Sequence, residues 1–565
     1  MDLVTGEAER AFMAAWWVVD DLVRFGLEHA CVSPGSRSTP VALALSRHPH
    51  VRLHVHLDER ASAFFALGVA KASGRPVAVA CTSGTAVAEL LPAVVEASMS
   101  RAALVLLTAD RPPELRGVGA NQTIDQPGIF GSYVRASIDA PVPGDAPDEH
   151  TWHQLVLGVT SASMGQPPGP VHLNLPFREP LVGVPAEPPA SQPSGTEPTP
   201  SAAPGPEELE ALERELMSTT RGLILAGSMR ESPATLPGLA LRAGWPLLAE
   251  PTSNLRVPGA LAAGQFLLAD PWFADAHVPD VVVQFGAAPT SRAGLELVRR
   301  APRLVIVDPD HLVADPHRKA AWTLRAEPAA FVPDLLEGVR PDVTPWLREW
   351  RDADAVARSA VDTLVDAWEW PFEGRIARDL AASLPEGSTL VVGSSMPVRD
   401  LDAYMSPRTG LAVIANRGAS GIDGFVSTAL GVAAAGRPTT ALCGDLTLLH
   451  DAGSLLWCAR RGHDAVFVVP NNDGGVIFSF LPQRELPELE ELFTTPHGLD
   501  LRALCGAAGA AHARVDRATD LTPAVERARS AGGVHVVEVP IDRAESVRMH
   551  EEVHAAVGAG LRRTM

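Results

Sequence analysis

Short apolar segments rich in β-branched residues alternate with helical patterns along most of this 565-residue chain, in three successive blocks. The first block contains the strand candidates HACVSP, RPVAVACTSG, AALVLLTAD and PVHLNLP and the helix candidates ASAFFALGVAKAS and AVAELLPAVVEASM. Buried strands separated by helices favour a parallel sheet that is covered on both faces. We therefore predict an α/β protein with three consecutive doubly wound domains whose sheets are mostly parallel.

The predicted domain boundaries follow changes in composition. Residues 1–186 form the first domain, and residues 187–206 are so rich in Pro, Ser, Gly and Ala that we predict a surface linker. Residues 207–345 repeat the alternation in RGLILAG, WPLLAEP, PDVVVQFG and APRLVIVDPD. Residues 346–565 begin with a mostly helical stretch and then contain the strand candidates STLVVGSS, LAVIANRG, TTALCGD, DAVFVVPNND and GVHVVEVP.

Composition narrows the class of protein. The chain is 46% hydrophobic and 20% charged, as in soluble globular proteins, and its formal net charge is -20. Nucleic-acid and anionic-membrane surfaces need clustered cations, so this balance argues against both. No segment approaches the roughly 20 apolar residues of a membrane span, and the N-terminus does not resemble a signal peptide. Five dispersed cysteines without a CxxC motif indicate a reduced, cytoplasmic protein.

Two pairs of polar or small residues that follow consecutive strands give the strongest indication of a binding site. Gly444 and Asp445 close one apolar strand, Asn471 and Asn472 close the next, and 27 positions (472 - 445) separate Asp445 from Asn472. Parallel sheets bind ligands at the carboxyl ends of their strands. Mg²⁺ prefers oxygen ligands, which the Asp445 carboxylate, the Asn472 amide and the backbone carbonyl of Gly474 can supply. Such residues also dominate ordinary turns, but this spacing on consecutive strands favours a magnesium and phosphate site.

Gly444 would let the backbone approach a phosphate, and the helix after Asp445 would point its N-terminus at the anion. Arginines in four motifs, SPGSRSTP, TADRPPEL, SSMPVRD and NRGASGIDG, follow strands in the same way. A guanidinium group matches a carboxylate in two-point geometry, so several such arginines favour a substrate with several carboxylates. Each arginine could instead pair with a nearby acid, as Arg399 could with Asp400 or Asp402.

The spacing of Asp445 and Asn472 resembles the signature of thiamine-diphosphate-dependent enzymes, in which GDG precedes NN by roughly two dozen residues. Leu446 replaces the last glycine, as in the carboligase family of menaquinone biosynthesis. The chain is similar to that family over its first and third blocks and only weakly in the middle. The matching motifs are SPGSRSTP, LDERASAFFALG, TSGTAVAELLPAVVEA, TADRPPELRGVGANQTIDQ, NLPFREPL, ANRGASGID, GDLTLLHD and NNDGGVIF.

The resemblance implies two cofactors, thiamine diphosphate and Mg²⁺, with Mn²⁺ as an alternative metal. Glu59 matches the catalytic glutamate of the family, a partly buried carboxyl beside N1′ of the cofactor pyrimidine. By position alone, Glu59 could equally stabilise a helix N-terminus. Ile422 would be the wedge that bends the cofactor, and Ile477 and Phe478 would line the thiazolium ring. All three could also be plain core residues.

The resemblance further implies a transferase that decarboxylates 2-oxoglutarate and adds the succinyl carbanion to isochorismate in a 1,4 fashion, releasing CO₂. The implied substrate contacts are Ser36, Arg37, Arg111, Gln122, Ser395, Arg399 and Arg417. Some relatives contribute a basic pair from the middle domain, where this chain has Arg292 followed by Ala293. Relatives also build each site from two subunits, so we expect a homodimer or a dimer of dimers (a homotetramer). We expect no nucleic-acid partner and no stable membrane insertion.

Three other interpretations remain open at this point. Another thiamine-diphosphate enzyme, such as an acetolactate synthase or a 2-oxoacid decarboxylase, would need no cluster of arginines in its pyruvate pocket. A non-catalytic nucleotide-binding α/β protein would not need Glu59, Asp445 and Asn472 together. A Rossmann dehydrogenase would carry GxGxxG after the first strand of a domain, and no block of the sequence has it.

Overall fold

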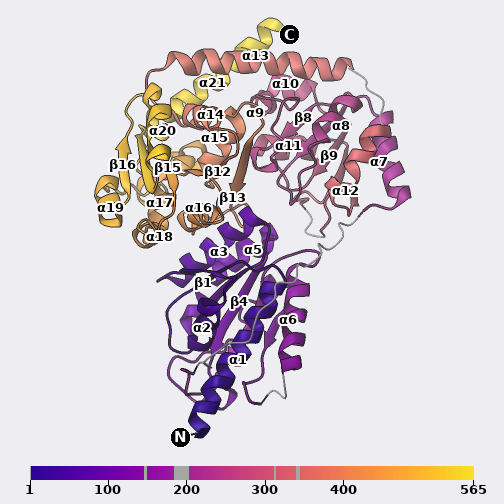
Figure 1. Cartoon of the computed structure of the whole chain (residues 1–565). Helices are drawn as coiled ribbons and strands as arrows, with labels where there is room; N and C mark the ends of the chain where they lie inside the picture. Colours follow the sequence, from indigo (N-terminus) through magenta and orange to yellow (C-terminus); the bar gives the residue numbers. More distant parts are fainter. Residues whose placement is uncertain (1, 146–148, 184–202, 311–313, 339–343) are drawn as a thin grey trace.

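The computed structural model describes residues 2–145, 149–183, 203–310, 314–338 and 344–565. Most of the predicted linker, residues 187–202, lies outside these ranges. Three separate sheets follow one another along the chain, and every strand pair in them is parallel. The predicted fold class, three α/β domains with parallel sheets, is therefore confirmed (Figure 1).

The first sheet has the strand order β2-β1-β3-β4-β6-β5. Its strands are β1 (His29–Val32), β2 (Arg52–Val55), β3 (Val77–Cys81), β4 (Leu104–Asp110), β5 (Ser137–Asp139) and β6 (Val171–Pro176). Its helices are α1 (Asp2–Arg24), α2 (Thr39–Arg47), α3 (Glu59–Ser73), α4 (Thr85–Ala88), α5 (Leu91–Ser100), η1 (Pro113–Leu115), η2 (Gly131–Tyr133) and α6 (Glu149–Ser163).

The second sheet has the order β11-β10-β9-β7-β8. Its strands are β7 (Gly222–Ala226), β8 (Leu247–Ala249), β9 (Val281–Phe285), β10 (Arg303–Val307) and β11 (Ala320–Leu324). The helices of this central domain are α7 (Pro206–Ser218), α8 (Leu236–Ala243), η3 (Pro251–Ser253), α9 (Gly264–Ala269), α10 (Pro271–Ala276), α11 (Arg292–Arg300) and α12 (Pro328–Gly338).

The third sheet has the order β13-β12-β14-β15-β17-β16. Its strands are β12 (Ser388–Val392), β13 (Leu411–Ala415), β14 (Thr439–Leu442), β15 (Ala465–Asn471), β16 (Ala511–Arg514) and β17 (Val534–Pro540). Its α-helices are α13 (Pro345–Ala367), α14 (Glu373–Ser383), α15 (Met396–Tyr404), α16 (Phe425–Ala434), α17 (Asp445–His450), α18 (Ala452–Cys458), α19 (Leu501–Ala508), α20 (Leu521–Ala531) and α21 (Arg543–Thr564). Short turns of helix are η4 (Val476–Phe480), η5 (Pro482–Glu485), η6 (Leu489–Thr494) and η7 (Ala518–Asp520).

Both faces of the first sheet are buried, because alternate residues of its strands enter different apolar cores. On β3, Val77 and Val79 pack into the core that contains α3, whereas Ala78 and Ala80 face the core that contains α1. Side chains alternate between the faces of a strand, so a sheet covered on both sides needs an unbroken apolar run. This explains why the strand sequences carry no polar alternation.

Helix α3 of the first domain packs against α16 of the third domain at two glycines. A Cβ on Gly68 would lie 2.0 Å from the backbone oxygen of Thr428, and one on Gly431 would lie 2.1 Å from that of Phe65. Larger residues would force the two backbones apart. The two helices consequently share one apolar core that is continuous between the first and third domains.

Two long helices, α13 and α21, lie along the upper side of the second and third domains in Figure 1. Trp350 and Val361 of α13 share a core with Val557 of α21 and with Phe273 of the central domain. The predicted boundary at residue 345 therefore coincides with the first residue of a helix that also packs on the central domain. Within the described ranges, no helix is both long and apolar enough to span a membrane.

We expect the free energy of unfolding to fall as the pH drops below about 6.5, because the half-buried His54 and the buried His56 become protonated in the unfolded chain but stay neutral in the folded one. The rings of His54 and His56 lie 5.0 and 4.5 Å from that of Phe65, and the third domain adds His463 at 5.4 Å from Phe65. Burial, aided by neighbouring positive charges, lowers the pKa of His54 to about 4 and that of His56 to about 3. Between those values and about 6.5, each histidine favours unfolding by about 1.4 kcal/mol per pH unit.

Thermal unfolding between about pH 7.5 and about pH 5 would measure this acid sensitivity. His56→Gln should make the melting temperature depend less on pH, because one of these two imidazoles is gone. The matched control is His317→Gln, since His317 is exposed. An equally steep pH dependence in wild type and His56→Gln would contradict the assignment.

Candidate active site

Three of the predicted site residues follow strands that flank the points where the strand order reverses. The order reverses between β1 and β3, between β7 and β9, and between β12 and β14. In open parallel sheets, connections leave such a point in opposite directions and open a crevice at the carboxyl ends of the strands. Arg37 follows β1, Ser395 follows β12 and Asp445 follows β14. Each therefore occupies a ligand-binding edge.

Asp445 is the first residue of α17 and is 1% exposed. Its Oδ1 accepts a hydrogen bond from the backbone N–H of Leu446 at 2.7 Å, and its Oδ2 accepts one from the N–H of Gly474 at 2.8 Å. Burial raises the pKa of this carboxyl, while the hydrogen bonds from Gly474 and Leu446 act in the opposite direction. A buried carboxylate without a cation is costly, so this position favours a bound positive charge.

Asn472, at the end of the neighbouring β15, supplies the second oxygen. Its Nδ2 donates to Glu373 Oε1 at 3.4 Å, so the amide oxygen points away from Glu373. That Oδ1 is buried and has no hydrogen-bond partner among the described residues. A buried polar atom without a hydrogen-bond partner needs an explanation, and a bound ion is one that fits an oxygen beside Asp445. The oxygens of Asp445 and Asn472 therefore fit a hard cation such as Mg²⁺.

Gly474 has a backbone φ of +139°, and a Cβ there would lie 2.2 Å from the carbonyl oxygen of Thr494. Only glycine fits this turn, which delivers the Gly474 N–H to Asp445. At Gly444 a Cβ would meet no atom within 4 Å, so the backbone there borders open space. This is the arrangement that a phosphate group lying against the start of α17 requires.

The described ranges hold no group of three or more His, Cys, Asp or Glu side chains arranged to bind a metal. A metal at Asp445 would therefore depend on an amide, a backbone carbonyl and non-protein ligands for its remaining coordination. Magnesium bound with substrate phosphates has this pattern, whereas zinc sites use closed sets of Cys and His.

His497 orients the Asp445 carboxylate, although sequence analysis did not identify it. Its Nδ1 accepts from the N–H of Leu499 at 3.0 Å, so the proton lies on Nε2, which donates to Asp445 Oδ2 at 3.2 Å. Partners of this kind typically change metal affinity 10- to 100-fold. We expect His497→Ala to weaken Mg²⁺ binding about tenfold, as measured by titration calorimetry.

His535→Ala is the matched control for His497→Ala. His535 lies on β17, and its ring contacts the carbonyl oxygen of Gly532 at 2.9 Å. We expect this variant to keep the Mg²⁺ affinity of the wild type. Equal Mg²⁺ affinities for His497→Ala and wild type would show that the imidazole does not hold Asp445 in place.

The three apolar residues predicted to surround the cofactor are all half-buried rather than part of a core. Ile422 lies in the bend before α16, between Gly421 and Gly424. Ile477 and Phe478 lie in η4, directly after the Gly474 turn. Half-exposed side chains can contact a ligand, and the assignment of these three residues stays a prediction.

Glu59 is the first residue of α3, and the preceding Asp58 is the N-cap that accepts from the N–H of Ala61 at 3.2 Å. Asp58 therefore caps α3, and the charge of Glu59 in the first turn can stabilise the helix N-terminus as well. Burial raises the pKa of the half-buried Glu59 carboxyl, and the charges of Asp58 and Glu89 raise it further. A carboxyl in such surroundings can hold a proton closer to neutral pH than a solvated one.

Glu59 and Asp445 each begin a helix, α3 and α17, and Arg60 of α3 donates to the carbonyl oxygen of His450 of α17 at 3.4 Å. The groups that act on Glu59 are Asp58 and Glu89, and those that act on Asp445 belong to Leu446, Gly474 and His497.

Arg37 and Arg111 form a pair at the carboxyl edge of the first sheet. Arg37 is buried and donates to the carbonyl oxygen of Phe177 at 2.8 Å and to Glu179 Oε1 at 3.0 Å. Burial lowers the pKa of Arg111, and the positive charge of Arg37 lowers it further. The exposed Glu179 is thus a counterion that a substrate carboxylate could replace.

Ser83 links this pair to Gln122. Arg111 donates to Ser83 Oγ, and the Gln122 side chain donates to the Ser83 carbonyl oxygen at 2.9 Å. Gln122 has a φ of +53°, which is unusual for a non-glycine residue and directs its side chain back to β3. Ser36 is exposed beside Arg37. The structure therefore brings these four predicted residues together.

Arg399 and Arg417 form a second pair at the third sheet. Arg399 donates to the carbonyl oxygen of Ser395 at 2.7 Å, which fixes the start of α15. The acids considered as partners of Arg399 are engaged elsewhere: Asp402 pairs with Arg256 at 3.3 Å and Asp400 with His550 at 3.1 Å. Burial lowers the pKa of both arginines, and the charge of Arg417 also lowers that of Arg399.

The central domain approaches this second pair. An Arg417 N–H lies 3.5 Å from Thr290 Oγ1, and Thr290 is two residues before the exposed Arg292. Thr290 in turn binds Glu250, which directly follows β8. The sequence places Glu250 directly after the strand WPLLA, which is a common position for a site residue. Nothing in the sequence indicates that Glu250 lies near Arg417.

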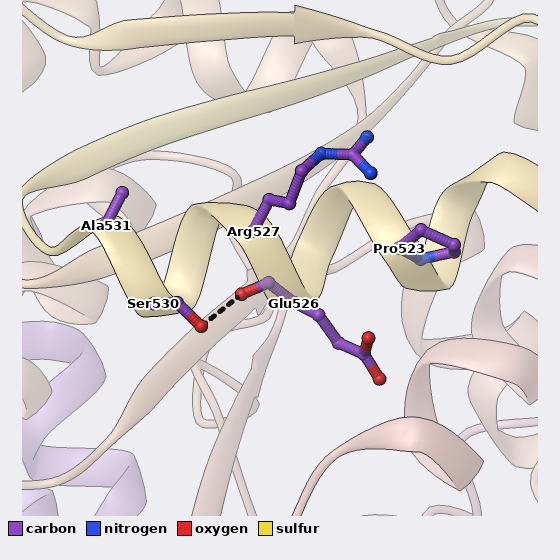
Figure 2. A pocket seen from close by; sticks show the side chains of 5 residues that line it. All are labelled: Pro523, Glu526, Arg527, Ser530 and Ala531. Atoms are coloured by element: carbon purple, nitrogen blue, oxygen red, sulfur yellow. Dashed lines mark hydrogen bonds between the residues drawn. The ribbon is translucent and has the colours of Figure 1, made fainter.

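Not every hollow on the surface is a candidate site. The hollow in Figure 2, about 540 Å³, is lined by Pro523, Glu526, Arg527, Ser530 and Ala531 of α20 alone. The Glu526 and Arg527 side chains point away from each other, and the Ser530 hydroxyl donates a hydrogen bond to the backbone carbonyl oxygen of Glu526. One outer helix face with no converging polar groups is a poor ligand site.

Three family models match the chain in order. The N-terminal TPP binding domain of thiamine pyrophosphate enzymes matches residues 13–129, and the middle domain of thiamine pyrophosphate matches residues 205–392. The C-terminal TPP binding domain matches residues 398–539. These segments contain Glu59 and the pair Asp445 and Asn472. The fold and the site thus define a thiamine pyrophosphate enzyme, where thiamine pyrophosphate is another name for thiamine diphosphate.

Curated relatives narrow this class. Proteins from Thermobifida fusca, Chloroflexus aurantiacus and Rubrobacter xylanophilus are 46%, 43% and 43% identical to the chain. The alignments cover 96%, 96% and 95% of this chain and 98%, 96% and 96% of the relatives. Each is a 2-succinyl-5-enolpyruvyl-6-hydroxy-3-cyclohexene-1-carboxylate synthase. The chain belongs to this synthase family.

Proposed function

We propose that the chain joins 2-oxoglutarate to isochorismate with loss of CO₂, forming 2-succinyl-5-enolpyruvyl-6-hydroxy-3-cyclohexene-1-carboxylate for menaquinone biosynthesis. The observation that carries the proposal is the match to relatives of this name along 96% of the chain. The two arginine pairs agree with it, because both substrates are dicarboxylic acids. An enzyme specific for pyruvate would need fewer cations at these strand ends.

Thiamine diphosphate, when bound, supplies the electron sink for decarboxylation and for carbon–carbon bond formation. Asp445 and Asn472, with the backbone carbonyl of Gly474, would hold Mg²⁺ and through it the diphosphate. Gly444 would leave the backbone free to approach that diphosphate. These residues anchor the cofactor and do not themselves react.

Glu59 would hold and release a proton at its carboxyl, against N1′ of the cofactor pyrimidine. Its raised pKa suits this role, since a general acid–base group works best when its pKa is near the operating pH. Arg37, Arg111, Arg399 and Arg417 would bind substrate carboxylates and fix two anions close together. Such positioning lowers the entropic cost of joining the two substrates. The guanidinium groups also attract two anions that a protein of net charge -20 would otherwise repel.

The active form would be a homodimer, or a dimer of dimers, with Glu59 of one subunit meeting Asp445 of another. This arrangement follows from the resemblance described from the sequence, since relatives of this kind build each site from two subunits. The work of the enzyme would take place in the cytoplasm, where five free cysteines would stay reduced.

Two experiments test these proposals. Purified protein with thiamine diphosphate and Mg²⁺ should release CO₂ from 2-oxoglutarate and form the adduct when isochorismate is added; consumption of pyruvate instead would reject the function. Co-expressed Glu59→Gln and Asp445→Ala chains should regain about a quarter of wild-type activity, because half of the dimers would then contain one intact site. No recovery would place both residues in one subunit.

A further inference from the structure

The loops at the carboxyl edge of the central sheet are bonded to the third domain near the second arginine pair. The Asn254 side chain accepts from the N–H of Val413 at 2.7 Å, and Arg256 Nε donates to the carbonyl oxygen of Met405 at 2.8 Å. These bonds place the edge that carries Glu250 and Thr290 against β13 and α15. The central domain is therefore fixed beside the candidate site and can act on it.

Glu250 is buried at this contact and reaches Arg417 through a hydroxyl. Its carboxylate accepts from the backbone N–H of Thr290 and, through Oε2, from Thr290 Oγ1 at 3.3 Å. The same Oγ1 lies 3.5 Å from an Arg417 N–H, which it can accept while its own proton goes to Glu250. The result is a chain from carboxylate to hydroxyl to guanidinium.

The charges at this contact also favour a role for Glu250 in holding the arginines. Arg399 and Arg417 are both partly buried and repel each other. Glu250 is the acid from the central domain whose charge acts on both of them. The other acids whose charges act on the two arginines are paired elsewhere: Asp402 with Arg256, Asp400 with His550 and Glu96 with Lys71. This leaves the group with a net positive charge for one incoming carboxylate.

We propose that Glu250, acting through Thr290, is a positioning residue that holds Arg417 beside Arg399 for binding a substrate carboxylate. This inference rests on the proposed function of the same site and gives the central domain a part in substrate recognition. Glu250 touches neither substrate nor cofactor in this scheme. It acts only on the position of the guanidinium groups.

The test is a set of steady-state measurements on the holoenzyme with 2-oxoglutarate as the varied substrate. Glu250→Gln keeps the size of the side chain and one acceptor for the Thr290 N–H but removes the charge. We expect it to raise KM about tenfold while kcat changes less than about threefold, because Arg417 loses the hydrogen-bonded acid that holds it in position for carboxylate binding, whereas the chemical step is untouched. Thr290→Val should shift KM in the same direction.

The double variant Glu250→Gln/Thr290→Val should be no worse than the more impaired single variant, since the two residues act in series. Ser232→Ala is the matched control: its hydroxyl also binds the loop after β8, at the carbonyl oxygen of Ser253, but lies outside this chain of bonds. We expect its KM to equal that of the wild type.

A purely structural Glu250 would give a different result. Its loss would lower the melting temperature and the fraction of active enzyme, and therefore kcat, and would leave KM unchanged. An unchanged KM in Glu250→Gln would overturn the inference. A wild-type protein that does not consume 2-oxoglutarate at all would instead overturn the proposed function, so the two failures are distinct.

Discussion

Glu59→Gln is expected to lower kcat about a thousandfold while thiamine diphosphate still binds. Glutamine has the same size and can still form a hydrogen bond to the pyrimidine, but it cannot take up or release a proton at neutral pH. A positioned acid–base group contributes about 10²- to 10⁴-fold to a rate, so the effect should fall on turnover. Steady-state kinetics would give kcat, and calorimetry with Mg²⁺ and thiamine diphosphate would give the cofactor affinity.

Stability should hardly change in Glu59→Gln, because Asp58 remains the N-cap of α3. Loss of one negative charge in the first turn of a helix costs at most about 1 kcal/mol. Glu89→Gln is the matched control, since Glu89 is an exposed acid whose charge acts on Glu59. Full turnover in Glu59→Gln, or an equal loss in Glu89→Gln, would remove Glu59 from the proton-transfer role.

The central strands could be predicted from sequence because burial on both faces leaves an unbroken apolar run. The strands that are absent from the candidate segments, β2, β5, β11 and β16, each lie at the edge of a sheet. Their residues are mostly half-buried or exposed, so they carry no such run. Edge strands are defined by their pairing with a neighbour, which a local pattern does not record.

The residues of the candidate site likewise fall into those that could be predicted from sequence and those that could not. Asp445, Asn472 and Glu59 could be proposed from sequence because each directly follows or precedes an apolar segment, at a position where the fold presents polar groups to a ligand. His497 and Glu250 could not, because they act through contacts with residues 52 and 40 positions away. Their neighbours in sequence look like ordinary turn residues. Only the folded chain shows that one contacts Asp445 and the other lies behind Arg417.

Asp445→Ala should weaken the binding of Mg²⁺ and of thiamine diphosphate together, each by more than about 100-fold, because the loss of a direct ligand should exceed that of an outer partner. The variant removes the carboxylate that follows β14, the neighbour of the strand that carries Asn472, and leaves the N–H of Gly474 without its acceptor.

The readout for Asp445→Ala is the rise in melting temperature when Mg²⁺ and cofactor are added. A ligand stabilises the folded state in proportion to the logarithm of its concentration over Kd, so a 100-fold weaker site loses about 2.7 kcal/mol of that stabilisation. Asp464→Asn is the control, since Asp464 lies at the opposite, amino end of β15 and binds the N–H of Gly533. It should keep the full ligand-induced rise. An undiminished rise in Asp445→Ala would mean that the metal is held elsewhere, because no other carboxylate in the chain's described ranges is bonded to the Gly474 turn in this way.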